Sequence, residues 1–170
     1  MSTPTSLNDV DLEAVGGLAA KIEEVPEVAA TVWKADVSWL GGFRSEATVR
    51  QFTMPSDEPT SLGGDDSAAN PVEQLLAALG NCLAVGYAAN ASKAGIRIDD
   101  MQISLEGDLD LHTFLGLKDE HAGYEAIRVA VDITSDASEE QLRALHATVV
   151  GSSPVGHTLS RAVPVQIDLT

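Results

Sequence analysis

Cys82 is the only cysteine of the chain and the side chain best suited to covalent chemistry. A cysteine thiolate is a strong nucleophile, whereas a thiol buried among apolar side chains behaves as a small, inert core residue. Cys82 lies in an alanine- and leucine-rich segment, residues 70–93, where either role would fit. The choice between these two roles decides whether the protein is an enzyme.

Other side chains point less clearly to chemistry. His157 follows Ser153 by four residues, which is a helical spacing, but a serine hydrolase also needs an acid and an oxyanion hole, for which the sequence has no signal. His112, His121 and His146 lack the spacing of metal ligands. We also find no phosphate-binding loop and no dinucleotide fingerprint. We therefore expect neither a metal nor a cofactor.

Composition restricts the class of protein. The 170 residues suffice for one domain, and 44% of them are hydrophobic but only 4% aromatic. The net charge of -16 argues against nucleic acid and anionic membrane surfaces as partners, because both require a basic face. One cysteine forms no internal disulfide, residues 1–11 lack signal-peptide features, and we expect no apolar stretch long enough to span a membrane. We therefore expect a cytoplasmic protein.

Helices and strands alternate along the chain. Residues 1–28 are expected to form an N-terminal extension with a short or broken helix over residues 7–24, weakened by Gly16 and Gly17. Alternating patterns predict strands at residues 29–40 and 43–52, joined as a hairpin by Gly41 and Gly42. The remaining predicted elements are a loop (53–70), a long helix (71–93), a strand (96–111), a loop (113–123), a strand (124–134), a helix capped by Ser138 (138–149), a helical turn (157–161) and a final strand (163–169).

The long helix is predicted to be apolar on nearly every side. Pro71 suits its first turn, and Gly95 suits its end. Because a chain of this size would struggle to bury such a helix alone, we expect the helix to lie at the centre of a homodimer.

The segment from Pro71 to Cys82 has the pattern Pro-x-Glu-x-Leu-Leu-Ala-Ala-Leu-x-x-Cys. It resembles the OsmC/Ohr family, which comprises osmotically inducible protein C and the organic hydroperoxide resistance proteins. The segment Ser152-Ser153-Pro154-Val155 resembles the family's second-cysteine region. The resemblance covers roughly residues 29–169. It implies an α+β, OsmC-like domain over residues 29–170, which forms an intertwined homodimer with long central helices packed against antiparallel sheets.

The resemblance also implies roles for individual residues. Cys82 matches the cysteine that attacks peroxides, and Ser153 stands at the position of the resolving cysteine, where it cannot form a disulfide. Arg44 best matches the arginine of the first hairpin, although Phe43 stands where that arginine is expected. Glu73 matches the glutamate at the start of the long helix, displaced by one position.

Each of these residues also has a plain structural interpretation. Arg44 and Arg50, six positions apart on the expected second strand, would be solvated charges on one face. Glu73 would be a favourable charge in the first helical turn, and Ser153 would cap the short helix after Pro154. Nine residues separate Glu73 from Cys82, about 13 Å along a straight helix, so the two side chains cannot touch within it.

Two functions stay open. The first is thiol-dependent reduction of organic hydroperoxides in a stress response, with Cys82 as nucleophile, Arg44 as its activator, Glu73 as the orienting residue and an external thiol as reductant. The second is a non-peroxidatic relative that binds a small apolar or thiol-bearing ligand at the dimer interface. A structural partner protein is a third class, which would need a large exposed apolar patch.

Overall fold

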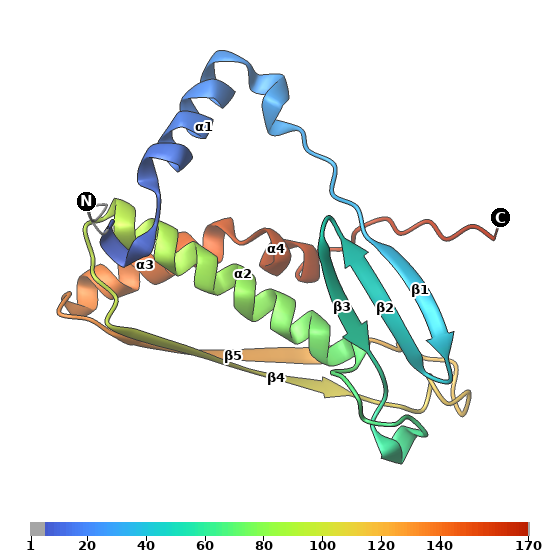
Figure 1. The fold of residues 1–170 in the computed structure, drawn as a ribbon. Coiled ribbons are helices and arrows are strands. Elements are labelled where there is room, and N and C mark those ends of the chain that lie inside the picture. The colour runs from blue at the N-terminus through green and yellow to red at the C-terminus, as the bar shows by residue number, and fades with distance from the viewer. Residues whose placement is uncertain (1–5, 170) are drawn as a thin grey trace. The chain divides into compact units, whose positions relative to one another are not determined.

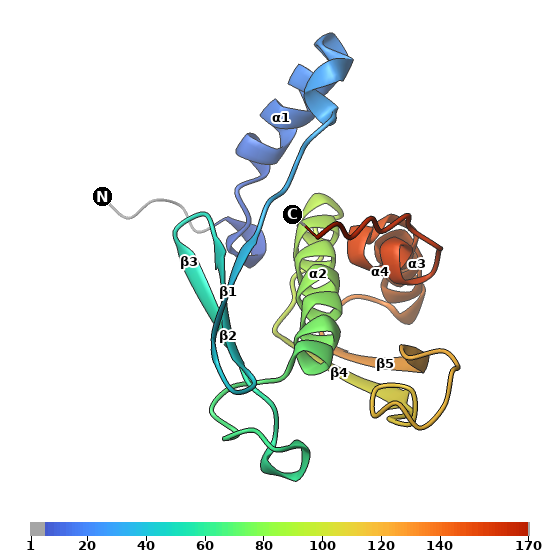
Figure 2. The same cartoon turned by 90° about the vertical axis from the view of Figure 1, so that its right-hand side faces the viewer.

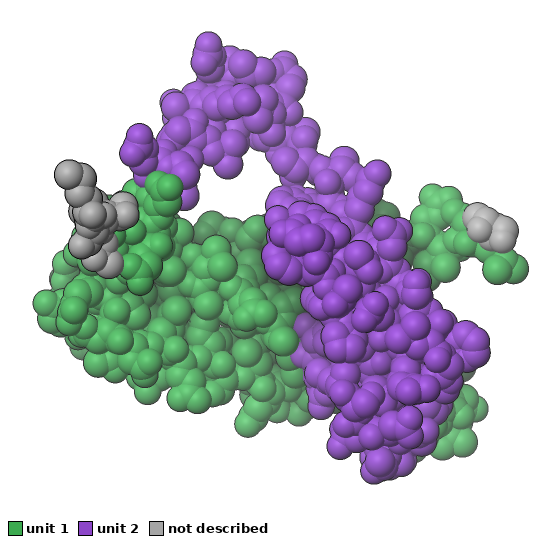
Figure 3. All heavy atoms as spheres, viewed as in Figure 1, with its two compact units in different colours: residues 1–12, 76–170 green, residues 13–75 purple. Residues whose placement is uncertain are grey.

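The computed structural model describes residues 6–169, which form α-helices and antiparallel sheets, the expected α+β class (Figure 1). The chain divides into two compact units, one formed by residues 13–75 and the other by residues up to 12 together with residues 76–170 (Figure 3). The predicted division into residues 1–28 and 29–170 stays a prediction. Residues 1–5 of that extension, and residue 170, lie outside the described part of the chain.

The unit of residues 13–75 contains a three-stranded antiparallel sheet in the order β1-β2-β3. Its strands are β1 (Asp36–Gly41), β2 (Arg44–Val49) and β3 (Phe52–Ser56). The predicted hairpin is confirmed, because Gly41 and Gly42 turn the chain with φ angles of 100° and 60° that favour glycine.

The predicted single strand over residues 43–52 is wrong. Arg50 has a φ of 56° and turns the chain between β2 and β3, a break that the strand alternation did not reveal. Arg50 and Arg44 therefore do not share one strand face, and the Arg50 guanidinium lies 5.2 Å from the centre of the Phe52 ring. The strand predicted over residues 29–40 begins only at Asp36.

The N-terminal helix is confirmed as α1 (Leu12–Glu24), and it continues through both internal glycines. None of its residues is buried. Two short 3-10 helices flank it, Leu7–Asp9 before it and Pro26–Ala29 after it.

The loop between β3 and the long helix is organised by the buried carboxylate of Asp57. Asp57 accepts hydrogen bonds from the backbone N–H of Glu58, Asp65 and Ser67 at 2.8–3.2 Å and from the Ser67 hydroxyl at 2.7 Å. The Ser67 hydroxyl is the main cause of a pKa for Asp57 below the ordinary 3.8. A segment predicted to be irregular is thus held by one side chain.

We expect Asp57→Asn to lower the melting temperature near neutral pH, because the charged acceptor is lost. The folded-state pKa of Asp57 is depressed, so its contribution is present above the unfolded value near 3.8 and is lost as pH falls through the lower folded value. Melting curves recorded from pH 7 downward should show the two proteins converging only below pH 3.8. Asp65→Asn, which removes an exposed charge in the same loop, is the control. A constant difference at every pH would contradict this role.

The long helix is confirmed as α2 (Pro71–Lys93), and the chain leaves it through Gly95 with a φ of 71°. Its buried face follows helical spacing and comprises Leu79, Leu83, Tyr87 and Ala91. By length and composition alone α2 could cross a membrane, contrary to the sequence-based expectation, but this face belongs to the protein core.

The unit of residues 76–170 packs α2 and two further helices on a two-stranded antiparallel sheet. The sheet pairs β4 (Asp100–Leu109) with β5 (Tyr124–Thr134). Figure 2 shows α3 (Glu139–Ser152) and α4 (Pro154–Leu159) beside α2, on the same side of this sheet. The side chains of the core cluster, with those packed against it, come from α2, β4, β5, α3 and the segments around them: Leu79, Leu83, Tyr87, Ala91, Ile96, Ile98, Met101, Ile103, Leu105, Ile127, Val131, Ile133, Ala137, Leu142, Leu145, Val149 and Val155.

The alternation predicted for β4 and β5 is confirmed, and Ser138 caps α3 through a capping box with Gln141. The predicted final strand is not formed: residues 163–169 pair with no strand in the described chain. Their apolar side chains are exposed, with Ile167 at 89%. Strand alternation without a neighbouring strand produces no ladder, which explains the difference.

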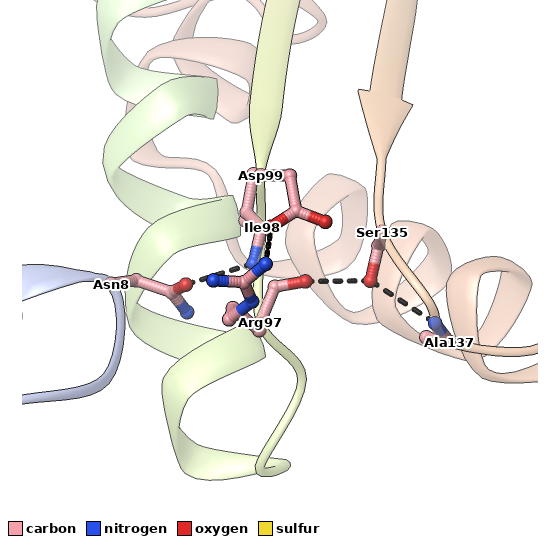
Figure 4. Close-up of polar contacts among 6 residues, drawn as sticks. All are labelled: Asn8, Arg97, Ile98, Asp99, Ser135 and Ala137. Carbon is pink, nitrogen blue, oxygen red and sulfur yellow. Dashed lines mark hydrogen bonds and ion pairs between the residues drawn. The ribbon is translucent and has the colours of Figure 1, made fainter.

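Asn8 joins the N-terminal segment to the end of α2 and to the segment before β4, and Figure 4 shows its hydrogen bond to Ile98. Its amide nitrogen donates to Ser92 Oγ at 3.0 Å and to the Ile96 carbonyl at 2.9 Å, and its amide oxygen accepts from Ile98 N at 2.9 Å. Asn8 has a φ of 55°, which asparagine tolerates better than most residues.

Replacing Asn8 should destabilise the fold. Asn8→Gly loses three hydrogen bonds without a backbone penalty, and we expect a loss of about 1–3 kcal/mol in the free energy of unfolding. Asn8→Ala should lose about 1 kcal/mol more, because alanine disfavours a positive φ. Urea denaturation followed by circular dichroism measures both. Asp9→Gly is the control, since Asp9 also has a φ of 55° and glycine there should cost no stability. Equal stability of all variants would rule out the anchoring role.

Candidate functional site

The lone thiol lies beside a buried serine. Cys82 on α2 is partly buried, and its Sγ lies 3.3 Å from the Oγ of Ser153. The side chain of Ser153 is 5% exposed. The structure therefore brings together the two residues at which the sequence resemblance expects the attacking and the resolving cysteine.

Close packing and a helix cap set this geometry. A Cβ on Gly80 would lie 2.8 Å from the end of the Leu105 side chain, so α2 packs closely on β4 at this point and a larger residue would require Leu105 to shift. Ser153 ends α3 and caps α4, with Pro154 in the first turn of α4. The short break between two helices thus directs the serine hydroxyl at the cysteine.

The serine hydroxyl has two hydrogen-bonding partners. Ser153 Oγ accepts a hydrogen bond from Gly156 N at 3.1 Å, and in its contact with Cys82 Sγ either atom can be the donor. When Cys82 is a thiolate, the serine hydroxyl is the donor. A hydroxyl that donates to a thiolate stabilises the negative charge. This contact can support a reactive thiolate, but a serine cannot close a disulfide with it.

Glu73 occupies the first turn of α2 as a capping residue. Its carboxylate accepts from Asn70 N at 2.8 Å, and Asn70 Oδ1 accepts from Glu73 N at 2.9 Å. These reciprocal bonds form a capping box, with asparagine as the N-cap residue. The structural interpretation of Glu73 is therefore observed, and its orienting role stays a prediction.

Arg44 lies at the start of β2, opposite Gly41, with its side chain exposed. Within the described residues it forms no ion pair. Arg44 belongs to the unit of residues 13–75, whereas Cys82 belongs to the other unit. Activation of Cys82 by Arg44 therefore stays a prediction.

The histidines do not assemble a hydrolase or a metal site. His157 Nε2 lies 3.1 Å from the Gly151 carbonyl, whereas the partners of Ser153 Oγ are Cys82 and Gly156. No group of three histidine, cysteine or acidic side chains suited to a metal occurs within residues 6–169.

Sequence analysis missed a buried tyrosine near this site that is hydrogen-bonded to an exposed histidine. The Tyr87 hydroxyl is hydrogen-bonded to His146 Nδ1, and burial raises the pKa of Tyr87. The four-residue spacing of Leu79, Leu83 and Tyr87 could have placed the tyrosine on the buried face. No sequence signal identified its partner, which comes from α3.

Ser153→Cys should form an intramolecular disulfide with Cys82 under mild oxidation, because the present side chains already touch and a disulfide needs a sulfur–sulfur distance of about 2.05 Å. Intact mass after oxidation should show the loss of two hydrogens and no alkylation by iodoacetamide. Ser152→Cys is the matched control, since Ser152 is exposed and its hydroxyl bonds the Thr148 carbonyl. Two alkylatable thiols in oxidised Ser153→Cys would show that the contact does not form.

Comparison with known proteins identifies one matching family model. The family model described as OsmC-like protein matches residues 64–168, which include Cys82 and Ser153. No curated protein sequence matches the chain.

Several solved structures share the fold at low sequence identity. An OsmC-like protein from Mycoplasma pneumoniae has a TM-score of 0.66 and 19% identity over 76% of this chain and 88% of its own. An organic hydroperoxide resistance protein OsmC from Legionella pneumophila has a TM-score of 0.58 and 17% identity over 76% and 91%. An organic hydroperoxide resistance protein from Elizabethkingia anophelis, with thiocyanate bound, has a TM-score of 0.57 and 16% identity over 75% and 88%. At these identities the likeness establishes the fold alone.

Proposed function

Because this chain belongs to the OsmC-like protein family, we propose that it reduces organic hydroperoxides with Cys82 and an external thiol. The observation that carries the proposal is the contact between Cys82 Sγ and the buried hydroxyl of Ser153. Two solved structures with this fold are described as organic hydroperoxide resistance proteins, which supports the same reaction.

The proposed cycle needs one protein thiol. The Cys82 thiolate attacks one peroxide oxygen, an S–O bond forms, the O–O bond breaks, and the leaving alkoxide takes a proton from solvent to become an alcohol. Sulfur is oxidised by two electrons to sulfenic acid, and the peroxide is reduced by two electrons. A small-molecule thiol then forms a mixed disulfide with Cys82 and releases water, and a second thiol releases Cys82 and a low-molecular-weight disulfide.

Three residues would assist Cys82 in this scheme. Ser153 donates its hydroxyl proton to the thiolate and, lacking sulfur, leaves the sulfenic acid open to the external thiol. Arg44 supplies a cation that favours the thiolate. Glu73 orients Arg44 while it caps α2.

We further propose that the protein acts as a cytoplasmic homodimer. The unpaired segment of residues 163–169 and the outer face of α2, where Val85 is 70% exposed, leave apolar surface that a second copy would cover. Apolar walls at such an interface would favour organic hydroperoxides over hydrogen peroxide.

A second candidate function is ligand binding without turnover. Glu73 stands one position away from the family's glutamate, its carboxylate is used in the capping box, and the chain has no second thiol. The same dimer would then bind a small apolar or thiol-bearing ligand, and Cys82 would not turn over.

Trapping of sulfenic acid separates the two functions. The intact protein is treated with stoichiometric cumene hydroperoxide in the presence of dimedone, and its mass is measured with time. We expect a rapid dimedone adduct on the wild type and none on Cys82→Ser. Absence of an adduct, with the peroxide left unconsumed, would refute the reductase and favour the ligand-binding function.

The role of Arg44 has a matched control in the same sheet. We expect Arg44→Gln to slow adduct formation about tenfold, the effect of about 1.4 kcal/mol of thiolate stabilisation. Arg50→Gln should leave the rate unchanged, because the Arg50 guanidinium lies over Phe52. Equal rates for Arg44→Gln and the wild type would show that Arg44 does not activate Cys82.

Glu73→Gln, which keeps a side chain able to cap α2, tests the charge of the glutamate separately.

A further inference from the structure

A pocket of about 540 Å³ opens between α2, β5, α3 and α4. All four walls come from residues 76–170, so the pocket belongs to one compact unit. Its size lies within the range of small-molecule sites. Ser153 is part of its lining but Cys82 is not, so the pocket adjoins the thiol site without containing the sulfur.

One wall of the pocket is apolar but uncovered. Ile127, Val131 and Ile133 of β5 pack against the core, whereas Val129, which shares their face by strand alternation, is 38% exposed. Val150 of α3 is 51% exposed. Both valines line the pocket, so a hydrocarbon group bound there would remove from water apolar surface that the chain itself leaves open.

The polar part of the lining is basic, in a protein of strongly acidic composition. No aspartate or glutamate lines the pocket, although the chain carries 26 of them and a net charge of -16. Arg161 and His157, four residues apart, both line it. In the part of the chain that the structure describes, Arg161 makes no ion pair. Acidic side chains instead line other pockets of the same unit: Asp132 and Glu139 line an adjoining pocket that shares Tyr87, Val131 and His146 with this one, and Asp108, Asp110 and Glu125 line a separate one.

We propose that this pocket binds an organic monocarboxylate, with its hydrocarbon tail against Val129 and Val150 and its carboxylate paired with Arg161. A single guanidinium matches the two oxygens of a carboxylate through parallel hydrogen bonds. No carboxylate in the lining competes for this cation, and a cationic ligand would find no acidic partner there. An inorganic anion would be a weaker ligand than an organic carboxylate, because it would leave the apolar wall of the pocket exposed to water.

This binding site requires no thiol chemistry. The ligand would rest against Ser153, and the titration that detects it contains no redox step. Failure of the peroxide experiment would therefore leave this proposal intact, and failure of the titration would leave the reductase intact.

Isothermal titration calorimetry with decanoate, below its micelle concentration, tests the proposal on the full chain. We expect saturable binding of one decanoate per chain. Decanol, which lacks the carboxylate, and acetate, which lacks the long hydrocarbon tail, should bind at least tenfold more weakly. Arg161→Gln should weaken the binding of decanoate at least tenfold and leave the affinity for decanol unchanged. Arg97→Gln removes an exposed arginine that pairs with Asp99 outside the pocket, and it should bind decanoate like the wild type.

A second pair of variants tests the apolar wall without relying on Arg161. Val150→Asp places a carboxylate in the lining, and Val150→Asn places a neutral side chain of the same shape there. The aspartate variant should bind decanoate at least tenfold more weakly than the asparagine variant. The proposal is overturned if decanoate shows no saturable binding, if decanol binds equally well, or if Arg161→Gln and Arg97→Gln weaken binding alike.

Discussion

The burial of one face of α2 is the constraint on which the rest of the unit of residues 76–170 depends. Leu79, Leu83, Tyr87 and Ala91 recur at four-residue spacing and must leave water together. They do so against the alternating faces of β4 and β5 and against Leu145 and Val149 of α3. With 4% aromatic residues, the protein builds this core mainly from aliphatic side chains, and Tyr87 is the aromatic member of the cluster.

The same constraint positions the thiol. Cys82 follows Leu79 by three residues, so it lies at the border of the buried face, where it is partly accessible and meets the buried cap of α4. The break between α3 and α4 at Ser153 then directs a hydroxyl at sulfur. The site is thus formed by the end of α3, the start of α4 and one face of α2.

Polar side chains, each with several partners, hold the segments that lack a core. Asn8 joins the N-terminal segment to the end of α2, Asp57 gathers the loop after β3, and Asn70 with Glu73 caps α2. A hydrogen-bonded carboxylate or amide can order a segment that buries little apolar surface, because its partners would otherwise be left without hydrogen bonds. This explains how a chain with 14 glycines and few aromatic residues keeps its loops in place.

The sequence by itself determined the α+β class, the bounds of α2 and β5, the first hairpin, the cap of α3 and the family resemblance carried by Pro71 to Cys82. These features depend on local periodicity and on glycine, proline and capping residues, which act over a few neighbours. Tertiary structure alone decided that Arg50 turns the chain, that residues 163–169 pair with no strand of the described chain, and that Ser153 reaches Cys82. It also created the pocket beside Arg161. These outcomes depend on contacts between residues far apart in the chain, which no local pattern encodes.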